Sequence, residues 1–263
     1  MNRIEQRMQE LSAKGEKAFI TYQTAGLPDM GRCVEVMKAI EEAGVDVIEL
    51  GVPFSDPIAD GPVIQDASFR SIQKGTTLVS TFEAVEKARG EGLNVPIIFM
   101  LYYNTVMYYG VEKFVERCRE VGVDGIIIPD LPLEEQGEIK GYLEGADSPI
   151  MIELVSPVSA ERIPKIVKGA KGFIYCVSAM GVTGQSGSFY GTINQYLQDV
   201  KDAADIPVMM GFGIRTAEDI APMKGIIDGA IVGSHFINIM EESAYDVNVA
   251  RDYVSTFKKE MNA

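Results

Sequence analysis

The stretch Gly44-Val45-Asp46-Val47-Ile48 decides the fold, because two later stretches repeat its form: Gly122-Val123-Asp124-Gly125-Ile126-Ile127 and Ile227-Asp228-Gly229-Ala230-Ile231-Val232. In each copy a helical pattern ends, a small or acidic residue turns the chain, and a buried strand begins. Repetition at roughly the length of a βα unit favours a closed barrel of parallel strands. An open, doubly wound sheet with the same number of elements is the alternative.

Short apolar runs continue this pattern along the whole chain. Several are nearly continuous in Val, Ile, Leu and Met, which is typical of parallel strands that are buried on both faces. Eight strands are predicted: Ala18–Thr21, Val45–Leu50, Pro96–Leu101, Gly125–Ile128, Ile150–Leu154, Gly172–Val177, Pro207–Met210 and Gly229–Val232.

Amphipathic segments between these runs predict helices. In Met30–Ala43 the apolar residues recur at the spacing i, i+3, i+4 and i+7, which is one face of a helix. Val111–Val121 and Ala160–Val167 have similar patterns, and Asn2–Ala13 predicts an extra helix before the first strand. The chain has 263 residues and no linker or low-complexity segment. It is therefore predicted to be a single α/β domain over residues 1–263, a (βα)8 TIM barrel with an extra amino-terminal helix.

Composition excludes several classes of protein. A net charge of −14 without a basic stripe argues against nucleic-acid binding. The amino terminus lacks the apolar core of a signal peptide, and no apolar stretch approaches the ~20 residues that span a membrane. We therefore expect a soluble cytoplasmic protein.

Cys33, Cys118 and Cys176 lie in apolar runs without metal-ligand spacing, which predicts buried reduced thiols.

Glu49 is the first candidate for chemistry, because it ends a predicted barrel strand, where active sites of such barrels gather. The pleat places it on the same face as Val45 and Val47. Burial among aliphatic side chains would raise its pKa and suit it to general acid–base catalysis. A buried glutamate paired with a cation is the equally good alternative when the strand is considered alone.

The next segment, Gly51–Pro62, favours the catalytic interpretation. It contains three prolines and two glycines, and it carries two more carboxylates, Asp56 and Asp60. Proline, glycine and aspartate are also ordinary turn residues. A long, restricted loop directly after an acidic strand end is nevertheless more typical of an active-site wall than of a connection.

Three glycine-rich segments follow later strands and suggest an anion site. They are Ser178–Gly187, Gly211-Phe212-Gly213-Ile214 and Gly233-Ser234-His235. Each glycine alone is best explained as a turn or a helix cap. Together, glycines at three successive strand ends let backbone N–H groups approach an anion, and a helix that starts at Ser234 would direct its positive end there. Phosphate is therefore the predicted ligand.

The remaining reactive side chains are weaker candidates. His235 is the only histidine, so histidine metal sites and serine triads lack their parts, and a helix-start or surface position is predicted for it. The lysines do not fall at carboxyl ends of strands, which leaves a Schiff-base aldolase little support. Tyrosines 102, 103, 108 and 109 cluster after the third strand, where they either pack in the core or line a pocket or interface.

The residues 49–57, Glu-Leu-Gly-Val-Pro-Phe-Ser-Asp-Pro, followed by Ala59-Asp60-Gly61-Pro62, resemble the signature of the tryptophan synthase alpha subunit family. The similarity continues through Gly181-Val182-Thr183-Gly184, Gly211–Ile214 and Gly233-Ser234, and it covers essentially the whole chain. Two departures stand out. Leu27 replaces the usual Asp of the family, and the flanks Ala179-Met180 and Gln185-Ser186 lack the arginine that is frequent there.

The resemblance implies a lyase that splits indole-3-glycerol phosphate into indole and glyceraldehyde 3-phosphate by a retro-aldol reaction, with no metal or organic cofactor in this chain. It implies that Glu49 is the acid–base and that Asp60 binds the indole N–H. The other implied substrate contacts are Tyr22, Ile64, Met100, Tyr175, Thr183, Gly184, Phe212, Gly213, Gly233 and Ser234. Gly184, Gly213, Gly233 and Ser234 would bind the phosphate, and Thr183 would lie in a loop that closes over the substrate.

The resemblance also implies a partner, the beta subunit, which carries pyridoxal phosphate and forms an alpha2beta2 heterotetramer with this chain. The loop Pro53–Asp60 is expected to face that partner, and Ala179–Tyr190 is expected to act as a lid. Three alternatives are kept: a stand-alone indole-glycerol-phosphate lyase, a barrel isomerase of another sugar phosphate, and a non-catalytic regulator of a beta-type enzyme.

Overall fold

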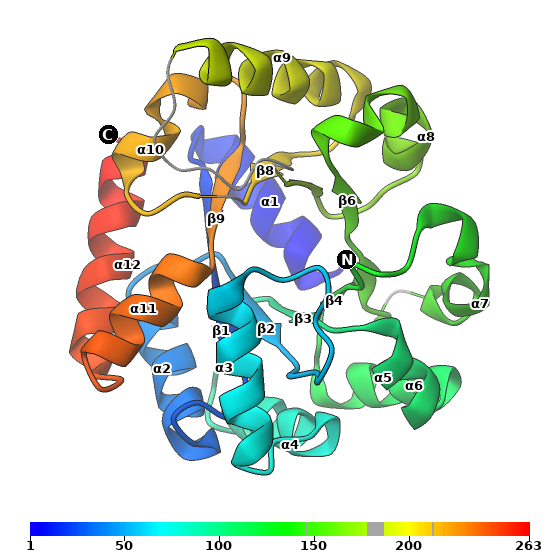
Figure 1. The fold of residues 1–263 in the computed structure, drawn as a ribbon, viewed down its shortest axis with the longest axis vertical. Coiled ribbons are helices and arrows are strands. Elements are labelled where there is room, and N and C mark those ends of the chain that lie inside the picture. Colours follow the sequence, from blue (N-terminus) through cyan, green and yellow to red (C-terminus); the bar gives the residue numbers. More distant parts are fainter. Residues whose placement is uncertain (146, 178–186, 212) are drawn as a thin grey trace.

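Parallel strands surrounded by helices form the centre of the molecule (Figure 1). The computed structural model describes residues 1–145, 147–177, 187–211 and 213–263. Within these ranges one sheet has the strand order β5-β4-β3-β2-β1-β9-β8-β7-β6. The strands are β1 (Ala18–Thr24), β2 (Val47–Gly51), β3 (Ile97–Met100), β4 (Gly125–Ile127), β5 (Ile150–Met151), β6 (Glu153–Val155), β7 (Ile174–Cys176), β8 (Val208–Met210) and β9 (Gly229–Val232).

The fifth predicted strand joins the two ends of this sheet. Ile150–Leu154 is not one strand but two, with Ile152 between β5 and β6. β5 pairs with β4, and β6 pairs with β7, so the interruption lies where the chain changes its pairing partner. The Ile152 N–H still donates to the Ile126 carbonyl at 2.9 Å. The predicted (βα)8 barrel is therefore confirmed, whereas the predicted continuity of its fifth strand is wrong.

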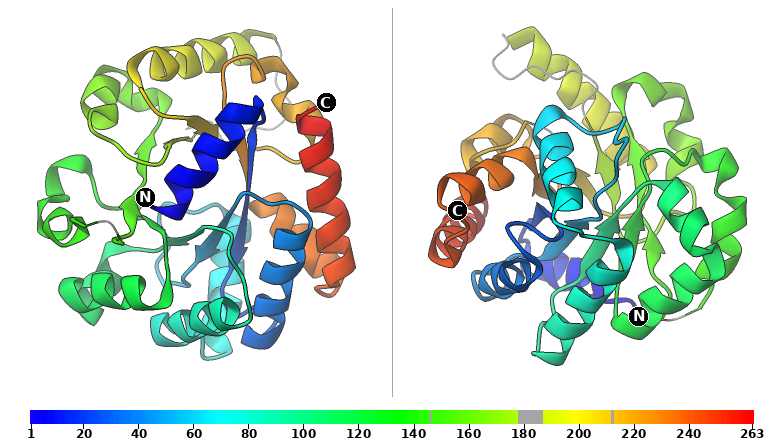
Figure 2. Two further views of the ribbon diagram at one scale, coloured as in Figure 1. Left: turned by 180° about the vertical axis from the view of Figure 1, so that it is seen from behind. Right: turned by 60° about the horizontal axis from the view of Figure 1, so that its bottom comes forward.

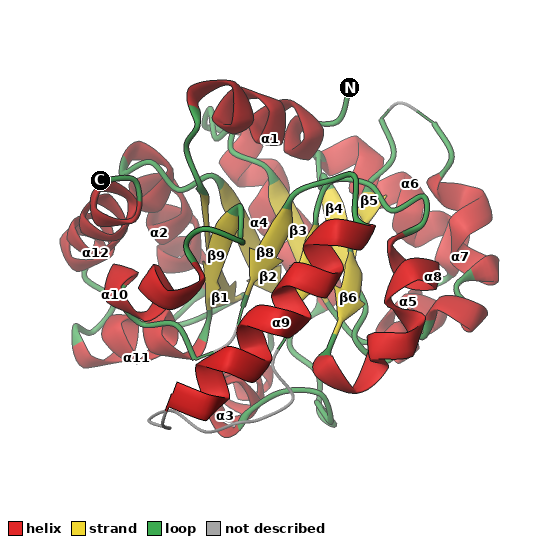
Figure 3. Cartoon of the chain, turned by 90° about the horizontal axis from the view of Figure 1, so that it is seen from above, coloured by secondary structure: helices red, strands yellow, loops and turns green. Residues whose placement is uncertain are grey.

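Helices cover the outside of the barrel, as Figures 1 and 3 show. The helices after β1 are α2 (Met30–Glu42), α3 (Pro62–Gln73), α4 (Leu78–Gly90), α5 (Tyr103–Tyr109), α6 (Val111–Val121), α7 (Gly137–Lys140), α8 (Ile163–Val167), α9 (Gly187–Ala203), α10 (Ala217–Ile220), α11 (Ser234–Glu242) and α12 (Val247–Met261). Short 3-10 helices are η1 (Leu133–Glu135), η2 (Gly141–Leu143), η3 (Pro157–Arg162) and η4 (Ala221–Met223).

The predicted helix boundaries are confirmed at Val111–Val121 and within one residue for Met30–Ala43. The prediction Ala160–Val167 is wrong in its first turn, where η3 runs to Arg162 and α8 begins only at Ile163. Pro164 lacks a backbone N–H and fits only the first turn of a helix, so α8 has to start next to it.

The extra amino-terminal helix is α1 (Arg3–Lys14), which Asn2 caps through its side chain. It lies across one end of the barrel, as Figure 2 shows from behind. Its residues Ile4, Met8 and Leu11 are buried with side chains from the barrel interior, such as Phe173. The helix therefore closes the amino-terminal end of the strands, opposite the end at which the candidate site lies.

The three repeated aspartates at this amino-terminal end make the same pair of contacts. Asp46, Asp124 and Asp228 each precede a strand, and each accepts a hydrogen bond from the backbone of the neighbouring strand. The donors are Phe19 N (2.6 Å), Ile97 N (2.8 Å) and Val208 N (2.7 Å), respectively. Each aspartate backbone N–H returns a bond to the same residue's carbonyl. The aspartate in each copy of the sequence repeat therefore aligns the first residues of two adjacent strands through a pair of hydrogen bonds.

Basic side chains pair with Asp46 and Asp124, the two of these aspartates that are buried. Asp46, which has no exposed side-chain surface, pairs with Arg7 of α1 at 2.7 Å and with Lys258 of α12. Asp124 pairs with Arg3 and Arg89, each at 2.8 Å. Two arginines one helical turn apart thus fasten α1 under the barrel.

We predict that Asp46→Asn lowers the free energy of unfolding by about 3 kcal/mol, because it leaves a partly buried arginine and lysine without their carboxylate. Urea unfolding at neutral pH measures this loss. Asp252→Asn, an exposed position on α12, is the control and should change the stability by less than about 0.5 kcal/mol. Equal effects of the two variants would contradict the role given to Asp46.

Two further expectations can be compared with the structure. Cys33, Cys118 and Cys176 are buried free thiols, as predicted. In the described residues, no helix combines the length and apolarity that crossing a bilayer requires.

Candidate active site

Glu49 lies near the carboxyl end of β2, between Tyr22 of β1 and Ile98 of β3. Its side chain is 1% exposed, and its Oε2 atom has no hydrogen-bond partner among the described residues. The described residues also form no ion pair with it, which favours the acid–base interpretation over the paired glutamate. Val45 belongs to the outer core, not to the face of Glu49, because β2 begins only at Val47.

Two causes raise the pKa of Glu49 from its ordinary value of 4.5 to about 8. The larger is burial, which disfavours the charged carboxylate, and the smaller is the negative charge of Asp60. The direction agrees with the expectation from the sequence. A carboxyl group that is neutral at pH 7 is suited to donate a proton.

Asp60 approaches the same space from the loop between β2 and α3. Its side chain is half-buried, and its Oδ2 accepts a hydrogen bond from the Tyr102 hydroxyl at 3.0 Å. Burial raises its pKa to about 6, and the hydrogen bond from Tyr102 opposes the increase. Asp56, the other carboxylate of this loop, is exposed and bonds to Ser55. The structure therefore brings only one of the two loop aspartates to Glu49.

Two tyrosines form walls beside these carboxyl groups. Burial is the largest cause that raises the pKa of both Tyr22 and Tyr175, and the charges of Glu49 and Asp60 raise both further. The four groups therefore face one space at the strand ends.

Glycines make room for both tyrosine rings. A Cβ atom on Gly51 would lie 2.0 Å from the Tyr22 hydroxyl oxygen, and one on Gly211 would lie 2.2 Å from the Tyr175 ring. In the sequence, Gly51 begins the proline-rich loop and Gly211 belongs to a glycine-rich segment that predicts an anion site. Their closest contacts are instead the two aromatic walls, a requirement that no local sequence pattern signals.

The remaining apolar site residues gather around Tyr22. Ile64 of α3 and Met100 of β3 are partly buried against its cluster, and their contact with the substrate stays a prediction. Leu27 is buried in the same cluster, so the departure from the usual Asp extends the apolar surface behind Tyr22.

The candidate phosphate residues lie after the neighbouring strands β8 and β9. Gly233 precedes α11, which begins at Ser234 as predicted, and a Cβ on Gly233 would contact Tyr22 and Ile64 at 3.6 and 3.8 Å. Gly213 has φ +67°, a left-handed conformation that favours glycine. Thr183, Gly184 and Phe212 lie outside the described residues, as does most of the predicted lid.

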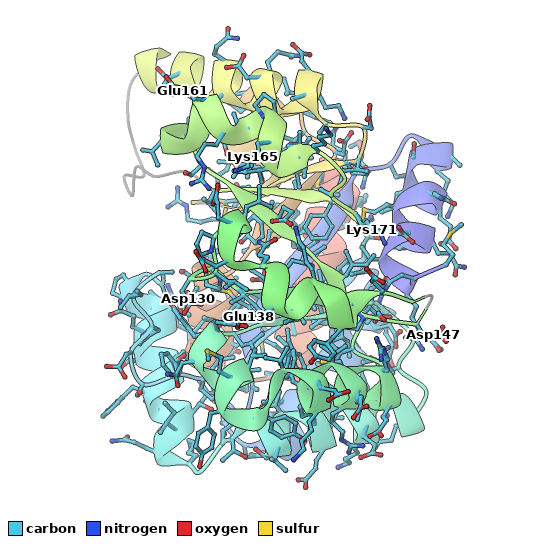
Figure 4. The ribbon with its side chains drawn as sticks, turned by 90° about the vertical axis from the view of Figure 1, so that its right-hand side faces the viewer. Asp130, Glu138, Asp147, Glu161, Lys165 and Lys171 are labelled. Carbon is cyan, nitrogen blue, oxygen red and sulfur yellow. The ribbon has the colours of Figure 1, made fainter. Side chains whose placement is uncertain are left out.

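The four clustered tyrosines have different surroundings. Tyr102 is buried and contacts Asp60, which the sequence did not assign to it. Tyr103 donates to Glu138, which Figure 4 shows on the outside of the barrel near Asp130. Tyr108 is 94% exposed, and Tyr109 packs on Phe82. His235, half-buried at the start of α11 beside Tyr253, occupies the predicted helix-start position.

Fold and site together define a (βα)8-barrel protein with two carboxyl groups and an aromatic wall at the carboxyl ends of its strands. That position is the one at which barrel enzymes carry out their chemistry. The chain belongs to the tryptophan synthase alpha chain family, whose family model matches residues 8–263. The resemblance drawn from the sequence is thereby confirmed.

Similar proteins support this membership over the full length. The tryptophan synthase alpha chain of Lachnospira eligens is 61% identical and covers 100% of both chains. That of Alkaliphilus metalliredigens is 45% identical over 94% of this chain and 92% of its own. The solved structure of tryptophan synthase subunit alpha from Legionella pneumophila superposes with a TM-score of 0.89 at 32% identity, and the alignment covers 99% of this chain and 98% of that one.

Proposed function

We propose that this chain is a carbon–carbon lyase that cleaves indole-3-glycerol phosphate to indole and glyceraldehyde 3-phosphate, the alpha reaction of tryptophan synthase. The observation that carries the proposal is the pair of Glu49 and Asp60, two carboxyl groups with raised pKa values beside one aromatic-walled space. A barrel isomerase would have less use for a second acidic group that is carried on a proline-rich loop.

In this mechanism neutral Glu49 donates its proton to C3 of the indole ring. The ring becomes a cationic indolenine, and the Asp60 carboxylate stabilises it by accepting the ring N–H. The Glu49 carboxylate then removes the proton of the hydroxyl group on the carbon attached to the ring. The carbon–carbon bond breaks, its electrons return to the ring, and an aldehyde forms. One proton has moved from hydroxyl to ring carbon, so Glu49 ends in its starting state.

The phosphate of the substrate is proposed to bind at the strand ends that precede α10 and α11. Gly213 and Gly233 would offer backbone N–H groups, and Ser234 begins a helix whose positive end favours an anion. Gly184 is proposed to complete this site, and Thr183 is proposed to belong to the loop that closes over the substrate. These donors are local dipoles, so the acidic net charge does not oppose them.

The beta subunit of tryptophan synthase is the proposed partner, and it would supply the pyridoxal phosphate of the joint enzyme. We test function and partnership together by measuring indole release from indole-3-glycerol phosphate, with and without a cognate beta chain. Indole release that the beta chain accelerates is the expected result. No indole under either condition overturns the proposed reaction, whereas release that the beta chain leaves unchanged favours a stand-alone lyase.

The two pKa values predict a bell-shaped dependence of kcat/KM on pH. Activity should fall below about 6, where Asp60 gains a proton and loses the charge that stabilises the intermediate. It should also fall above about 8, where Glu49 loses the proton that it must donate. Initial rates at low substrate between pH 5 and 9.5 test this, and a flat profile across that range would contradict the assignment.

A further inference from the structure

Tyr102 lies after the carboxyl end of β3 and contacts the loop that carries Asp60. Its neighbour Leu101 donates a backbone hydrogen bond to Ile127 at 3.0 Å, which continues the β3–β4 ladder. On the other side, the Tyr102 carbonyl accepts from Thr105 in the first turn of α5. The side chain is 3% exposed, so both the backbone and the ring are fixed by packing.

From this position Tyr102 contacts the loop at three residues. Its ring stacks on Phe54 with the centroids 5.0 Å apart and 22° between the planes. Its hydroxyl oxygen accepts a hydrogen bond from the Ala59 N–H at 2.9 Å. The same hydroxyl lies 3.0 Å from Asp60 Oδ2, to which it donates. One strand-end side chain thus holds both the start and the end of the loop.

The hydrogen-bond roles at the Tyr102 hydroxyl have a fixed direction. A backbone N–H can only donate, so the phenol oxygen accepts from Ala59. The single phenol proton then points to Asp60, because an ionised carboxylate can only accept. The arrangement selects the charged form of Asp60 and occupies one of its two oxygens, Oδ2.

We propose that Tyr102 is a positioning residue for the alpha reaction: it binds Asp60 Oδ2 and thereby presents Oδ1, negatively charged, to the N–H group of the indole ring. The proposal rests on the proposed function, since it assigns a role within the same site. The alternative is that Tyr102 serves only to pack the loop. The two roles differ in what the hydroxyl does, since packing needs the ring alone.

The test is Tyr102→Phe, which keeps the ring on Phe54 and removes only the hydroxyl. We expect kcat/KM to fall about 10- to 100-fold, the range for losing a hydrogen bond to a charged group. The loss should appear mainly in kcat, because the charge on Asp60 is needed most in the cationic intermediate. The acidic limb of the pH profile should move toward higher pH, since the hydrogen bond that lowers the pKa of Asp60 is gone.

Tyr103→Phe is the matched control. It removes the neighbouring hydroxyl, which also donates to a carboxylate at 3.0 Å, but that carboxylate belongs to Glu138 on the outside of the barrel. Its activity and pH profile should equal those of the wild type. Phe54→Leu is the second variant, because it disturbs the stack and keeps the hydroxyl. It should leave the acidic limb in place.

These measurements separate the outcomes. An acidic limb that stays at its wild-type pH in Tyr102→Phe overturns the proposal, whatever the change in rate. So does a profile in Phe54→Leu that moves as far as that of Tyr102→Phe, since loop packing then explains both. Failure of the wild-type chain to release indole, with or without a beta chain, is instead the failure of the proposed function.

Discussion

Glu49→Gln is expected to reduce indole release from indole-3-glycerol phosphate by at least about 10²–10⁴-fold while the barrel stays folded. Glutamine has the same size but carries no proton that it can donate to the indole ring and no carboxylate to recover one. Glu49 lies in β2, between β1 and β3, and its Oε2 atom has no hydrogen-bond partner among the described residues. The exchange therefore breaks no described contact at that atom. Steady-state indole release gives the rate, and circular dichroism verifies the fold.

Glu153→Gln is the matched control for this experiment. Glu153 also lies in a barrel strand and is 5% exposed, but its carboxylate contacts Gln136 and Lys140 in the outer layer. Its replacement should affect stability without removing the catalytic proton. Wild-type turnover by Glu49→Gln would refute the acid–base assignment, and an equal loss in both variants would point to a general effect of altered strand residues.

Stability measurements provide a second test of Glu49, because its raised pKa makes the free energy of unfolding depend on pH. At a pH below its ordinary pKa of 4.5, Glu49 is neutral in the folded and the unfolded chain. As the pH rises from 4.5 to about 8, the unfolded chain ionises while the folded chain stays neutral, so the wild type loses stability. Glutamine does not titrate. Glu49→Gln should therefore gain stability relative to the wild type across this interval, as urea midpoints at pH 4.5 and 8.5 would show.

Asp60→Asn is expected to have the second largest effect, a loss of about 10²–10³-fold in kcat, comparable to removal of one preorganised electrostatic group. The asparagine amide keeps the size and still offers an oxygen to the Tyr102 hydroxyl, so the loop can remain in place. It no longer provides the negative charge that stabilises a cationic indolenine. The loss should fall on kcat more than on KM, because the charge on the ring develops after binding.

The same loop supplies the control, Asp56→Asn. Asp56 is exposed and bonds to Ser55, so this exchange removes one negative charge from the loop without changing the contact between Tyr102 and Asp60. For the isolated chain we expect turnover close to that of the wild type. If Asp56→Asn and Asp60→Asn lose activity equally, the effect belongs to the net charge of the loop and not to the position of Asp60.

The sequence alone was sufficient to predict the barrel and to select the two carboxyl groups as candidates. Parallel strands buried on both faces require continuous apolar runs, and the helices that cover them require one apolar stripe. Both patterns involve residues that are close together in the sequence, so they can be recognised without the structure. Because chemistry in a barrel gathers at strand ends, the order along the chain also singled out Glu49 and the loop with Asp60. Strand β1 extends beyond the prediction, because Gln23 and Thr24 follow the apolar run but still pair with Leu50 and Gly51.

Only the tertiary structure decided which distant residues meet. The bond from Tyr102 to Asp60 joins residues 42 positions apart, and the pair of Lys258 and Asp46 joins residues 212 apart. The division of the fifth strand at Ile152 follows from a change of neighbours, not from its composition. A sequence pattern reports the period and polarity of one segment, whereas closure of the barrel fixes the distances between segments. Contacts across the barrel, including the one that positions Asp60, therefore exist only once the ring of strands is closed.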